Sequence, residues 1–352
     1  MSVTAASSLY PKITQHVAEV AKILKELEHS FHPPSKDAIF ESVPLVGSVK
    51  LHGTHADILV YHDDRIVLQS KNVSNITIAN DNQGFAAAMA DKTNVILDVR
   101  NQYLTRWKCF HPNMPLDIRS PVLIAGEWIG TAIQKDVAVS QLSRRFVIIS
   151  VKINNSWIQD TQYPDVEAPL SSIYNISRGG TFNGTLYSND IARTLSEVEP
   201  FAESVAASCP FAASFGIHGE GEGIVWKPAP PHLNSNPALW LKTKGGRFRP
   251  TFAPAPKRLP ADLQEKRDAA NAVAVIWCTE ERLQQGWDFL EEVGVKRNMK
   301  ELGRFLRWVQ SDIMTEERAY VEENGVDEGM LRVGIAKIAR VWYMRRVGMG
   351  EG

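Results

Sequence analysis

The strongest constraint on the fold is a change in the hydrophobic pattern of the chain near residue 250. Before this point, short apolar runs alternate with polar loops rich in Gly, Asn and Ser, which is typical of strands. After it, apolar residues recur at helical spacing. A proline-rich stretch at 254–260 separates the two regions and has the composition of a linker. We therefore expect an α+β fold, with a large domain over residues 1–255 and a small all-α domain over residues 256–352.

The same periodicity predicts the individual elements. Residues 13–30 carry one apolar helical face, and residues 191–208 read as a second helix. Residues 46–72 read as a hairpin that turns at His62-Asp63-Asp64. We expect further strands at 94–99, 121–133, 145–153, 223–227 and 239–244, a loop at 177–189, and helices at 261–284, 286–293, 298–312 and 315–345.

Composition excludes several classes of protein. Lys and Arg number 39 against 40 Asp and Glu, so a uniformly basic surface for nucleic acid is excluded, whereas a local basic groove is not. The three cysteines form no Cys-x-x-Cys pair, which argues against a disulfide scaffold or a zinc site. No apolar run approaches the roughly 18 residues of a membrane span, and the N-terminus lacks the pattern of a secretory signal. We expect no membrane association and a reducing, intracellular compartment, either cytoplasm or nucleus.

The stretch most informative about chemistry is Lys-Leu-His-Gly-Thr-His at 50–55. Its Lys-x-x-Gly core is weak evidence alone, because the pattern recurs at 242–245 and 300–303. Its significance comes from three motifs downstream: Gly-Glu-x-x-Gly at 126–130, Glu-Gly-x-Val-x-Lys at 222–227 and Lys-x-Lys at 242–244.

The residue types in these motifs suit transfer of a phosphate-linked group. Lys242 and Lys244 lie two apart on an expected strand, so their side chains share one face and can address one phosphate. Two such cations also disfavour the charged form of a third lysine beside them, which a lysine nucleophile requires. Glu222 offers the oxygen ligand that Mg²⁺ prefers, and Gly53 allows close approach of the backbone to a ligand.

In this order, the motifs resemble those of the covalent nucleotidyltransferases, which comprise polynucleotide ligases and RNA capping enzymes. The likeness is greatest to the RNA ligase 2 family, typified by the bacteriophage T4 enzyme, and it covers roughly residues 40–250. The resemblance implies an ATP-grasp-like nucleotidyltransferase domain of antiparallel sheets with flanking helices. It also implies ATP and Mg²⁺ or Mn²⁺ as cofactors, and RNA with 5′-phosphate and 3′-hydroxyl ends as the partner.

The resemblance assigns roles to individual residues. Lys50 matches the nucleophile that forms lysyl–AMP, and Lys242 and Lys244 match the catalytic pair that contacts the α-phosphate. Glu127 matches the residue that holds the ribose, and Glu222 matches the metal ligand. The implied nucleotide-binding set is Lys50, Leu51, His52, Gly53, Glu127, Ile149, Glu222, Lys227, Lys242 and Lys244; the metal set is Glu222 and His55; and the RNA or phosphate contacts are Lys71 and Arg247.

Three positions depart from the family pattern. His55 stands where the family usually has Asn, and Val49 stands where an acidic residue is common before the nucleophile. Ile149 occupies the position of an aromatic ring that stacks on the base, so we expect an apolar lid there, with Phe146 as the nearest alternative ring.

The resemblance implies a monomeric ATP-dependent RNA ligase that acts through lysyl–AMP and an adenylylated RNA 5′ end, in RNA repair or end-joining. A DNA ligase or an mRNA capping guanylyltransferase is the alternative within the same chemistry. Both usually carry an OB-fold after Lys-x-Lys, where this chain reads as helices. An RNA-binding protein that keeps the nucleotide pocket without joining ends is the alternative from another class.

The helical region also carries a run of basic residues, Lys337, Arg340, Arg345 and Arg346. A solvated helix face and a nucleic-acid clamp both remain open as interpretations of this run.

Overall fold

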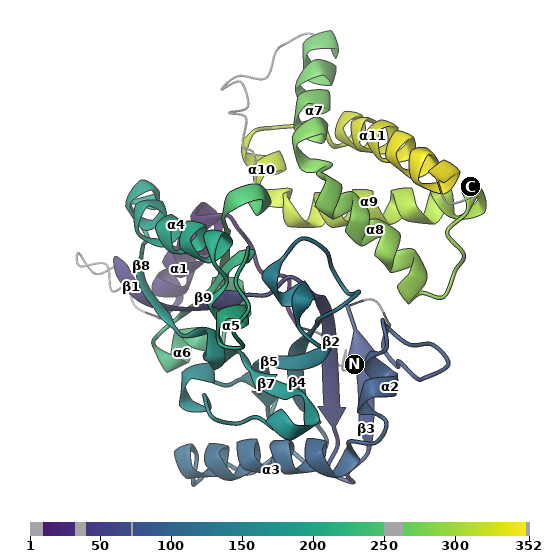
Figure 1. Ribbon diagram of the computed structural model, residues 1–352. Helices are drawn as coiled ribbons and strands as arrows, with labels where there is room; N and C mark the ends of the chain where they lie inside the picture. Colours follow the sequence, from purple (N-terminus) through teal and green to yellow (C-terminus); the bar gives the residue numbers. More distant parts are fainter. Residues whose placement is uncertain (1–9, 32–39, 72, 250–262, 350–352) are drawn as a thin grey trace, which may run out of the picture. The chain divides into compact units, whose positions relative to one another are not determined.

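The computed structural model describes residues 10–31, 40–71, 73–249 and 263–349. The contacts of the chain divide it into two compact units, Met1–Arg249 and Pro250–Gly352 (Figure 1). The linker predicted at 254–260 and the predicted boundary between residues 255 and 256 lie outside the described residues. Each unit has its own hydrophobic core.

The first unit contains a four-stranded antiparallel sheet in the order β10-β9-β1-β8. Its strands are β1 (Ser42–Lys50), β8 (Phe182–Tyr187), β9 (Gly223–Pro228) and β10 (Leu241–Lys244). Along β1 every second side chain is buried, and Val43, Leu45 and Val49 join one core with residues of α1 (Val17–Phe31) and α4 (Ile191–Ala207). Because successive side chains of a strand point to opposite faces, Lys50 lies on the face away from this core.

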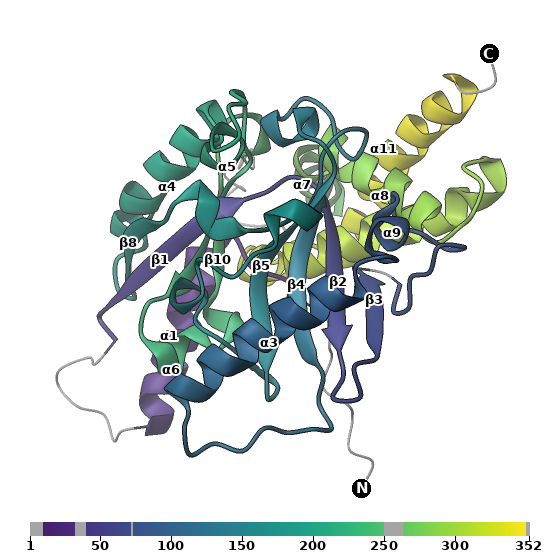
Figure 2. The same ribbon diagram turned by 60° about the horizontal axis from the view of Figure 1, so that its bottom comes forward.

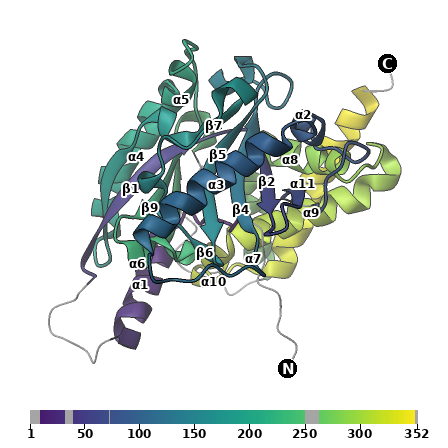
Figure 3. The ribbon, with the colours of Figure 1, turned by 90° about the horizontal axis from the view of Figure 1, so that it is seen from below.

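A second sheet of six strands follows the order β3-β2-β4-β5-β6, and β7 pairs with β5. Its strands are β2 (Thr54–Val60), β3 (Ile66–Ser70), β4 (Val122–Ile129), β5 (Arg145–Ile153), β6 (Ser156–Trp157) and β7 (Ile173–Asn175). All pairs are antiparallel except β5 with β7. Helix α3 (Thr93–Phe110) crosses one face of this sheet, and α2 (Phe85–Met89) lies beside it (Figures 2 and 3).

Two predictions for this unit are wrong. The strand predicted at 94–99 is the start of α3, where Ile96, Val99, Tyr103 and Trp107 are buried at helical spacing. A window of six residues is too short to separate the two periods. The loop predicted at 177–189 contains β8. The short helices α5 (Pro210–Ala213) and α6 (Pro231–Asn234) follow α4 and β9.

The second unit is helical, as predicted, but a break at 278–279 divides the helix predicted at 261–284, and a break at 324–327 divides the one predicted at 315–345. It comprises α7 (Leu263–Trp277), α8 (Glu280–Glu292), α9 (Leu302–Glu316), α10 (Arg318–Glu323) and α11 (Glu328–Met349). Their apolar faces form one core that includes Phe305, Leu331, Ile335 and Tyr343. The fold class is therefore confirmed: antiparallel sheets with flanking helices, followed by an all-α region. Among the described helices, none has the length and apolarity that crossing a membrane requires.

The two sheets of the first unit meet through side chains of β5 and β9. Lys227 Nζ donates a hydrogen bond of 2.9 Å to Ser150 Oγ, and Ile149 packs against hydrophobic clusters of both sheets. On β2, Ala56, Ile58 and Val60 belong to the core under α3. The alternate residues of β2 therefore point away from α3, toward the region where the sheets meet.

Candidate active site

The predicted nucleophile lies in a cluster of four charged or titratable side chains, which we call the Glu222 cluster: Lys50, His52, Glu222 and Lys244. Lys50 ends β1, and its Nζ donates to Glu222 Oε2 at 2.7 Å. Lys244 Nζ lies 3.0 Å from Glu222 Oε1. His52 Nδ1 lies 3.3 Å from Glu222 Oε2. Strand register explains the convergence, because Lys50 and Lys244 are both partners of Gly223, the residue after Glu222.

Glu222 is almost fully buried, with 2% of its side chain exposed. Burial by itself raises the pKa of a carboxyl group. Here the positive charges of Lys50 and Lys244, with a hydrogen bond from His52, outweigh burial and hold the pKa of Glu222 well below its usual range. The carboxylate is therefore ionised at neutral pH and pairs with both lysines.

Gly223 fixes the backbone of this cluster. Its φ is +156°, and a Cβ at this position would lie 2.0 Å from the carbonyl oxygen of Thr243. Glycine is therefore required for β9 and β10 to approach closely beside Glu222.

Glu127, from the motif at 126–130, contacts the motif at 50–55. Its Oε1 accepts a hydrogen bond of 2.9 Å from the backbone N–H of Gly53. A Cβ on Gly53 would lie 2.4 Å from the carbonyl oxygen of Trp128, so this close contact also requires glycine. Burial raises the pKa of Glu127, and the charges of Lys50 and His55 only partly oppose that shift. The structure therefore brings Glu127 close to the Glu222 cluster.

A second group of titratable residues lies next to Glu127 on the six-stranded sheet. We call it the Asp57 cluster: Tyr10, His55, Asp57 and Glu127. His55 is the strand partner of Glu127, and its Nε2 lies 2.9 Å from Asp57 Oδ1, although the angles do not fit a hydrogen bond. Asp57 is fully buried, and neither of its carboxylate oxygens has a hydrogen-bond partner among the described residues.

Burial lowers the pKa of His55, but the Asp57 carboxylate outweighs it, so the net direction is upward. Tyr10 places its ring 5.4 Å from that of His55 and also packs against Trp157 and Trp240. Burial and the carboxylates of Asp160, Glu127 and Asp57 raise the pKa of its phenol.

Sequence reasoning assigned no role to Tyr10, Asp57 or Asp160. For Asp57 a signal existed, because a charged residue stands two positions after His55 in an otherwise apolar strand. For Tyr10 there was none, since its contacts are with residues at least 45 positions away.

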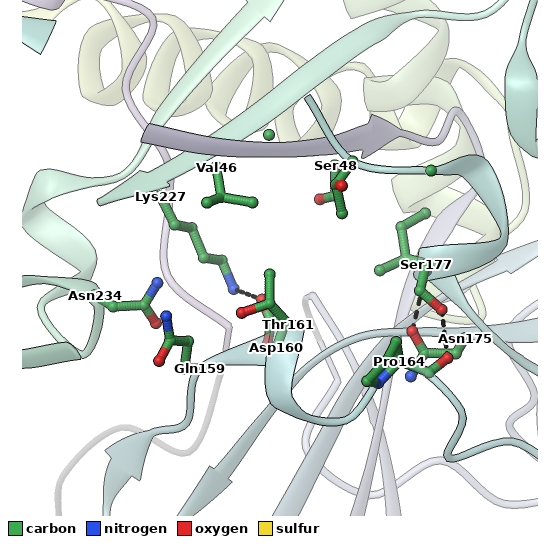
Figure 4. Close-up of a pocket in the computed structure, with 14 residues that line it drawn as sticks. Val46, Ser48, Gln159, Asp160, Thr161, Pro164, Asn175, Ser177, Lys227 and Asn234 are labelled. Atoms are coloured by element: carbon green, nitrogen blue, oxygen red, sulfur yellow. Dashed lines mark hydrogen bonds and ion pairs between the residues drawn. The ribbon is translucent and has the colours of Figure 1, made fainter. Parts of the chain in front are cut away.

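A cavity of about 320 Å³ opens beside β1 (Figure 4). Val46 and Ser48, on the same face of β1 as Lys50, line it with Lys227, Asp160 and further residues that lie mostly in loops and short helices. The further residues are Gly47, Gln159, Thr161, Pro164, Asn175, Ile176, Ser177, Gly180, Thr181 and Asn234.

Lys227 belongs to the nucleotide-binding set that the resemblance implies. It is buried, and its Nζ donates to Asp160 Oδ2 at 2.5 Å and lies 3.8 Å from the ring centroid of Trp240. Burial lowers the pKa of Lys227, and Asp160 opposes this shift. Lys227 therefore links β9 to Ser150 of β5 and to Asp160 at one wall of the cavity.

Two of the remaining predicted residues, Lys242 and Ile149, lie on strands near the site, and two others, Leu51 and Phe146, are buried in the hydrophobic cores. Lys242 is on β10 beside the Glu222 cluster, while Ile149 is half-buried at the centre of β5. Leu51 is 5% exposed and packs in the core of the four-stranded sheet, so only its backbone can contact a ligand. Phe146 is fully buried against Phe85 and is therefore not available to stack on a base.

The two predicted RNA contacts lie on the surface. Lys71 is exposed just after β3, and its positive charge opposes the rise in the pKa of His55. Arg247 is held by Glu220, 3.0 Å from its Nε, and by the carbonyl oxygen of Asp136. The Glu220 contact places Arg247 near the loop that carries Glu222.

His55 and Glu222, the predicted metal residues, do not contact each other in any interaction found for the described residues. Within those ranges, no group of three or more His, Cys, Asp or Glu side chains is arranged to hold a metal ion. A cation at Glu222 would therefore need further oxygen ligands from a bound substrate, which is a common mode for Mg²⁺.

Comparisons with known proteins gave structural likenesses only. No family model and no curated protein matches the chain. Among solved structures, a variant of the RNA ligase of Naegleria gruberi with ATP and Mn has a TM-score of 0.43 and 14% identity over 69% of this chain. The same ligase with pyrophosphate gives a TM-score of 0.43 and 13% identity over 68% of this chain. The matches span 58% and 57% of those ligase chains.

Proposed function

We propose that this protein is an ATP-dependent RNA ligase of the covalent nucleotidyltransferase type, similar to the T4 RNA ligase 2 family. One observation carries the proposal. Lys50 and Lys244 bind the two oxygens of the buried Glu222, although these residues are far apart in the sequence. Glu127, from a further motif, binds Gly53 beside them. Four weak motifs thus meet around one lysine, which chance matches would not do.

The first chemical step would use Lys50 as nucleophile. Its Nζ attacks the α-phosphorus of ATP, an N–P bond forms, the bond to the bridging oxygen breaks, and pyrophosphate leaves. An ammonium bound to an ionised carboxylate is not a nucleophile, so Lys50 must leave Glu222 and lose a proton first. Lys242 and Lys244 would stabilise the charge that develops on the phosphate oxygens.

Two transfers would follow. The AMP passes from Lys50 to the 5′-phosphate of an RNA strand, and the 3′-hydroxyl of another strand then attacks that phosphate and releases AMP. The product is a phosphodiester bond. Such a reaction would serve RNA repair or end-joining.

The residues present also fit the cofactors of such a reaction. A cavity of about 320 Å³ is at the lower end of the range for small-molecule sites, which suits a nucleoside. Asn234 lines it, and its Oδ1 is a buried acceptor with no partner among the described residues, so it suits a ligand N–H group such as an adenine amine. Glu222 would hold Mg²⁺ or Mn²⁺, and His55 is the second residue of the implied metal set. A metal bound there would neutralise phosphate charge.

The experiment is covalent labelling of the protein. The protein, stripped of bound AMP with pyrophosphate, is incubated with Mg²⁺ and each α-labelled nucleoside triphosphate in turn. We expect label from ATP that stays on the protein through denaturing gel electrophoresis at neutral or alkaline pH and that is lost in Lys50→Ala. Lys300→Ala is the matched control, because Lys300 begins another Lys-x-x-Gly tetrapeptide but is exposed in the helical unit. Labelled protein is then chased with 5′-phosphorylated RNA, nicked or single-stranded, to detect adenylylated and joined RNA.

The outcomes separate the alternatives. Label from GTP alone would indicate capping chemistry. Labelling with ATP, followed by joining of nicked DNA but not of RNA, would indicate a DNA ligase. No label from any nucleotide would refute the Lys50 mechanism and favour a protein that binds RNA without joining it.

A further inference from the structure

Helix α11 of the second unit has a highly asymmetric charge. From Gly329 to Gly348 it carries five Lys or Arg residues and no Asp or Glu, in a chain whose net charge is -1. An ordinary solvated helix mixes both signs and gains from pairs four residues apart. The asymmetry therefore needs a physical reason other than solubility.

The five basic residues divide by position around the helix. Arg332 lies 3.8 Å from Glu328, and Arg346 lies 3.9 Å from Glu280 and bonds to Gln284. Lys337, Arg340 and Arg345 are the other three, and they are exposed. Within the described ranges, no ion-pair partner is found for these three.

The three unpaired cations share one face. At 100° per residue, Lys337, Arg340 and Arg345 fall within an arc of about 140°. The opposite face, with Leu331, Ile335, Ala339 and Tyr343, is fully buried in the helical core. We call the exposed face the basic arc: Val333, Lys337, Arg340, Val341, Met344 and Arg345. Its three apolar members are 70%, 47% and 50% exposed.

We propose that the basic arc of α11 binds the sugar-phosphate backbone of the RNA substrate. This proposal rests on the proposed function and names the surface that would hold the RNA. Three long cationic side chains over about 12 Å of helix suit a run of phosphates, which proteins contact without reading sequence. The exposed apolar side chains between them suit the riboses and unstacked bases of a strand.

The chemistry of the arc favours RNA over a membrane surface. A helix that lies in a membrane interface buries a continuous apolar face in the lipid. The continuous apolar face of α11 is already buried in the protein core, and only three separated apolar side chains lie among the charges. The occupant must therefore be bound mainly by charge.

The test uses the full-length protein and two matched triple variants. The first, Lys337→Ala with Arg340→Ala and Arg345→Ala, removes the charges of the arc. The control, Arg304→Ala with Arg318→Ala and Arg332→Ala, removes three exposed charges of the same unit that are paired with Glu301, Glu322 and Glu328. Alanine preserves helix propensity in both, and thermal melting by circular dichroism checks that both fold.

Binding of 5′-phosphorylated RNA is measured from 50 to 200 mM salt. Each phosphate contact contributes about 0.7–0.9 to the slope of log K against log salt, so we expect the arc variant to lose about 2–3 in slope. We also expect its affinity to fall at least about tenfold at the lower salt concentrations, while the control stays within about threefold. Label from ATP should be unchanged in both variants, because their substitutions lie outside the unit that holds Lys50.

Each contrary result has a distinct meaning. An arc variant that binds RNA with the parent's slope, or a control that loses as much, would overturn the inference even if lysyl–AMP forms. A parent that binds vesicles with anionic lipid through the arc, but not RNA, would also overturn it. Loss of RNA binding in the arc variant of a protein that takes no label from ATP would leave the arc standing and refute the proposed function.

Discussion

The Glu222 cluster and the Asp57 cluster handle buried negative charge in opposite ways. Glu222 has cations on both of its oxygens, whereas neither oxygen of Asp57 has a hydrogen bond among the described residues. Both carboxylates are at least 98% buried. Glu222 is therefore neutralised by two lysines, whereas the buried Asp57 carboxylate depends on one imidazole, that of His55, whose Nε2 lies 2.9 Å from Asp57 Oδ1.

The largest expected effect is that of Glu222→Gln. The substitution leaves Lys50 and Lys244 without their shared counter-charge, and breaking a largely buried pair in this way destabilises a protein by about 2–4 kcal/mol once partial exposure of the lysines is considered. Denaturant unfolding at pH 7.5 measures it. Because the pKa of Glu222 is lowered, its contribution is present above about pH 4.3 and is lost as pH falls through the folded-state value.

Glu203→Gln is the control for this variant. Glu203 is 43% exposed and pairs with Arg249 at 3.3 Å, so its loss should change stability by less than about 0.5 kcal/mol. If both variants unfold at the same denaturant concentration as the parent, the Glu222 cluster does not stabilise the fold, and the contrast with Asp57 fails.

Asp57→Asn should act in the opposite direction at high pH. Above the pKa of His55 the imidazole is neutral and no longer offsets the charge of the buried Asp57 side chain, so we expect the variant to be more stable than the parent by about 1–3 kcal/mol at pH 8.5. The pKa of folded His55 is raised, so its stabilising contribution is present below about pH 6.5 and is lost as pH rises through the folded-state value. The advantage of the variant should therefore shrink or reverse at pH 5.5.

Unfolding curves of parent and variant from pH 5.5 to 8.5 measure this difference. The other titratable groups that act on His55 are Glu127 and Lys71, and neither is changed. His55→Gln should remove the same pH dependence, whereas His62→Gln, in the exposed hairpin turn, should keep it. A difference between parent and Asp57→Asn that does not vary with pH would rule out coupling between His55 and Asp57.

The two clusters also differ in how far the sequence predicts them. Every member of the Glu222 cluster belongs to one of the motifs that carry the family resemblance, so the convergence of Lys50, Glu222 and Lys244 could be expected from that resemblance. The Asp57 cluster depends on tertiary packing. Tyr10 reaches His55 because residue 14 pairs with β10, a contact that no local pattern encodes.

The same division between local sequence patterns and long-range packing decides which elements of the fold the sequence predicts. The hairpin of β2 and β3 and the helical character of the second unit are predicted, because each has a long or well-punctuated pattern, whereas the helix breaks at 278–279 and 324–327 are not. The start of α3 was read as a strand, because Val95, Ile96 and Leu97 form an apolar run whose helical continuation is partly hidden by polar residues. Long-range burial beneath the six-stranded sheet decides its conformation.

The smallest expected effect concerns Ile149, which packs between hydrophobic clusters of both sheets. If it forms an apolar lid on the nucleotide base, Ile149→Ala removes about 1 kcal/mol of apolar contact and raises the KM for ATP in lysyl–AMP formation about fivefold, with kcat unchanged. Ile149→Phe restores an aromatic surface, whose stacking on a base is worth about 1–3 kcal/mol, so its KM should fall below that of the parent.

Initial rates of labelling over a range of ATP concentrations measure both variants, and Ile153→Val, a buried change in the same strand, controls for loss of packing in β5. An Ile149→Ala variant with normal KM and reduced kcat would place the side chain away from the base. The nucleotide would then be held without apolar contact from β5, and charged side chains such as those of the Glu222 cluster would have to supply its binding.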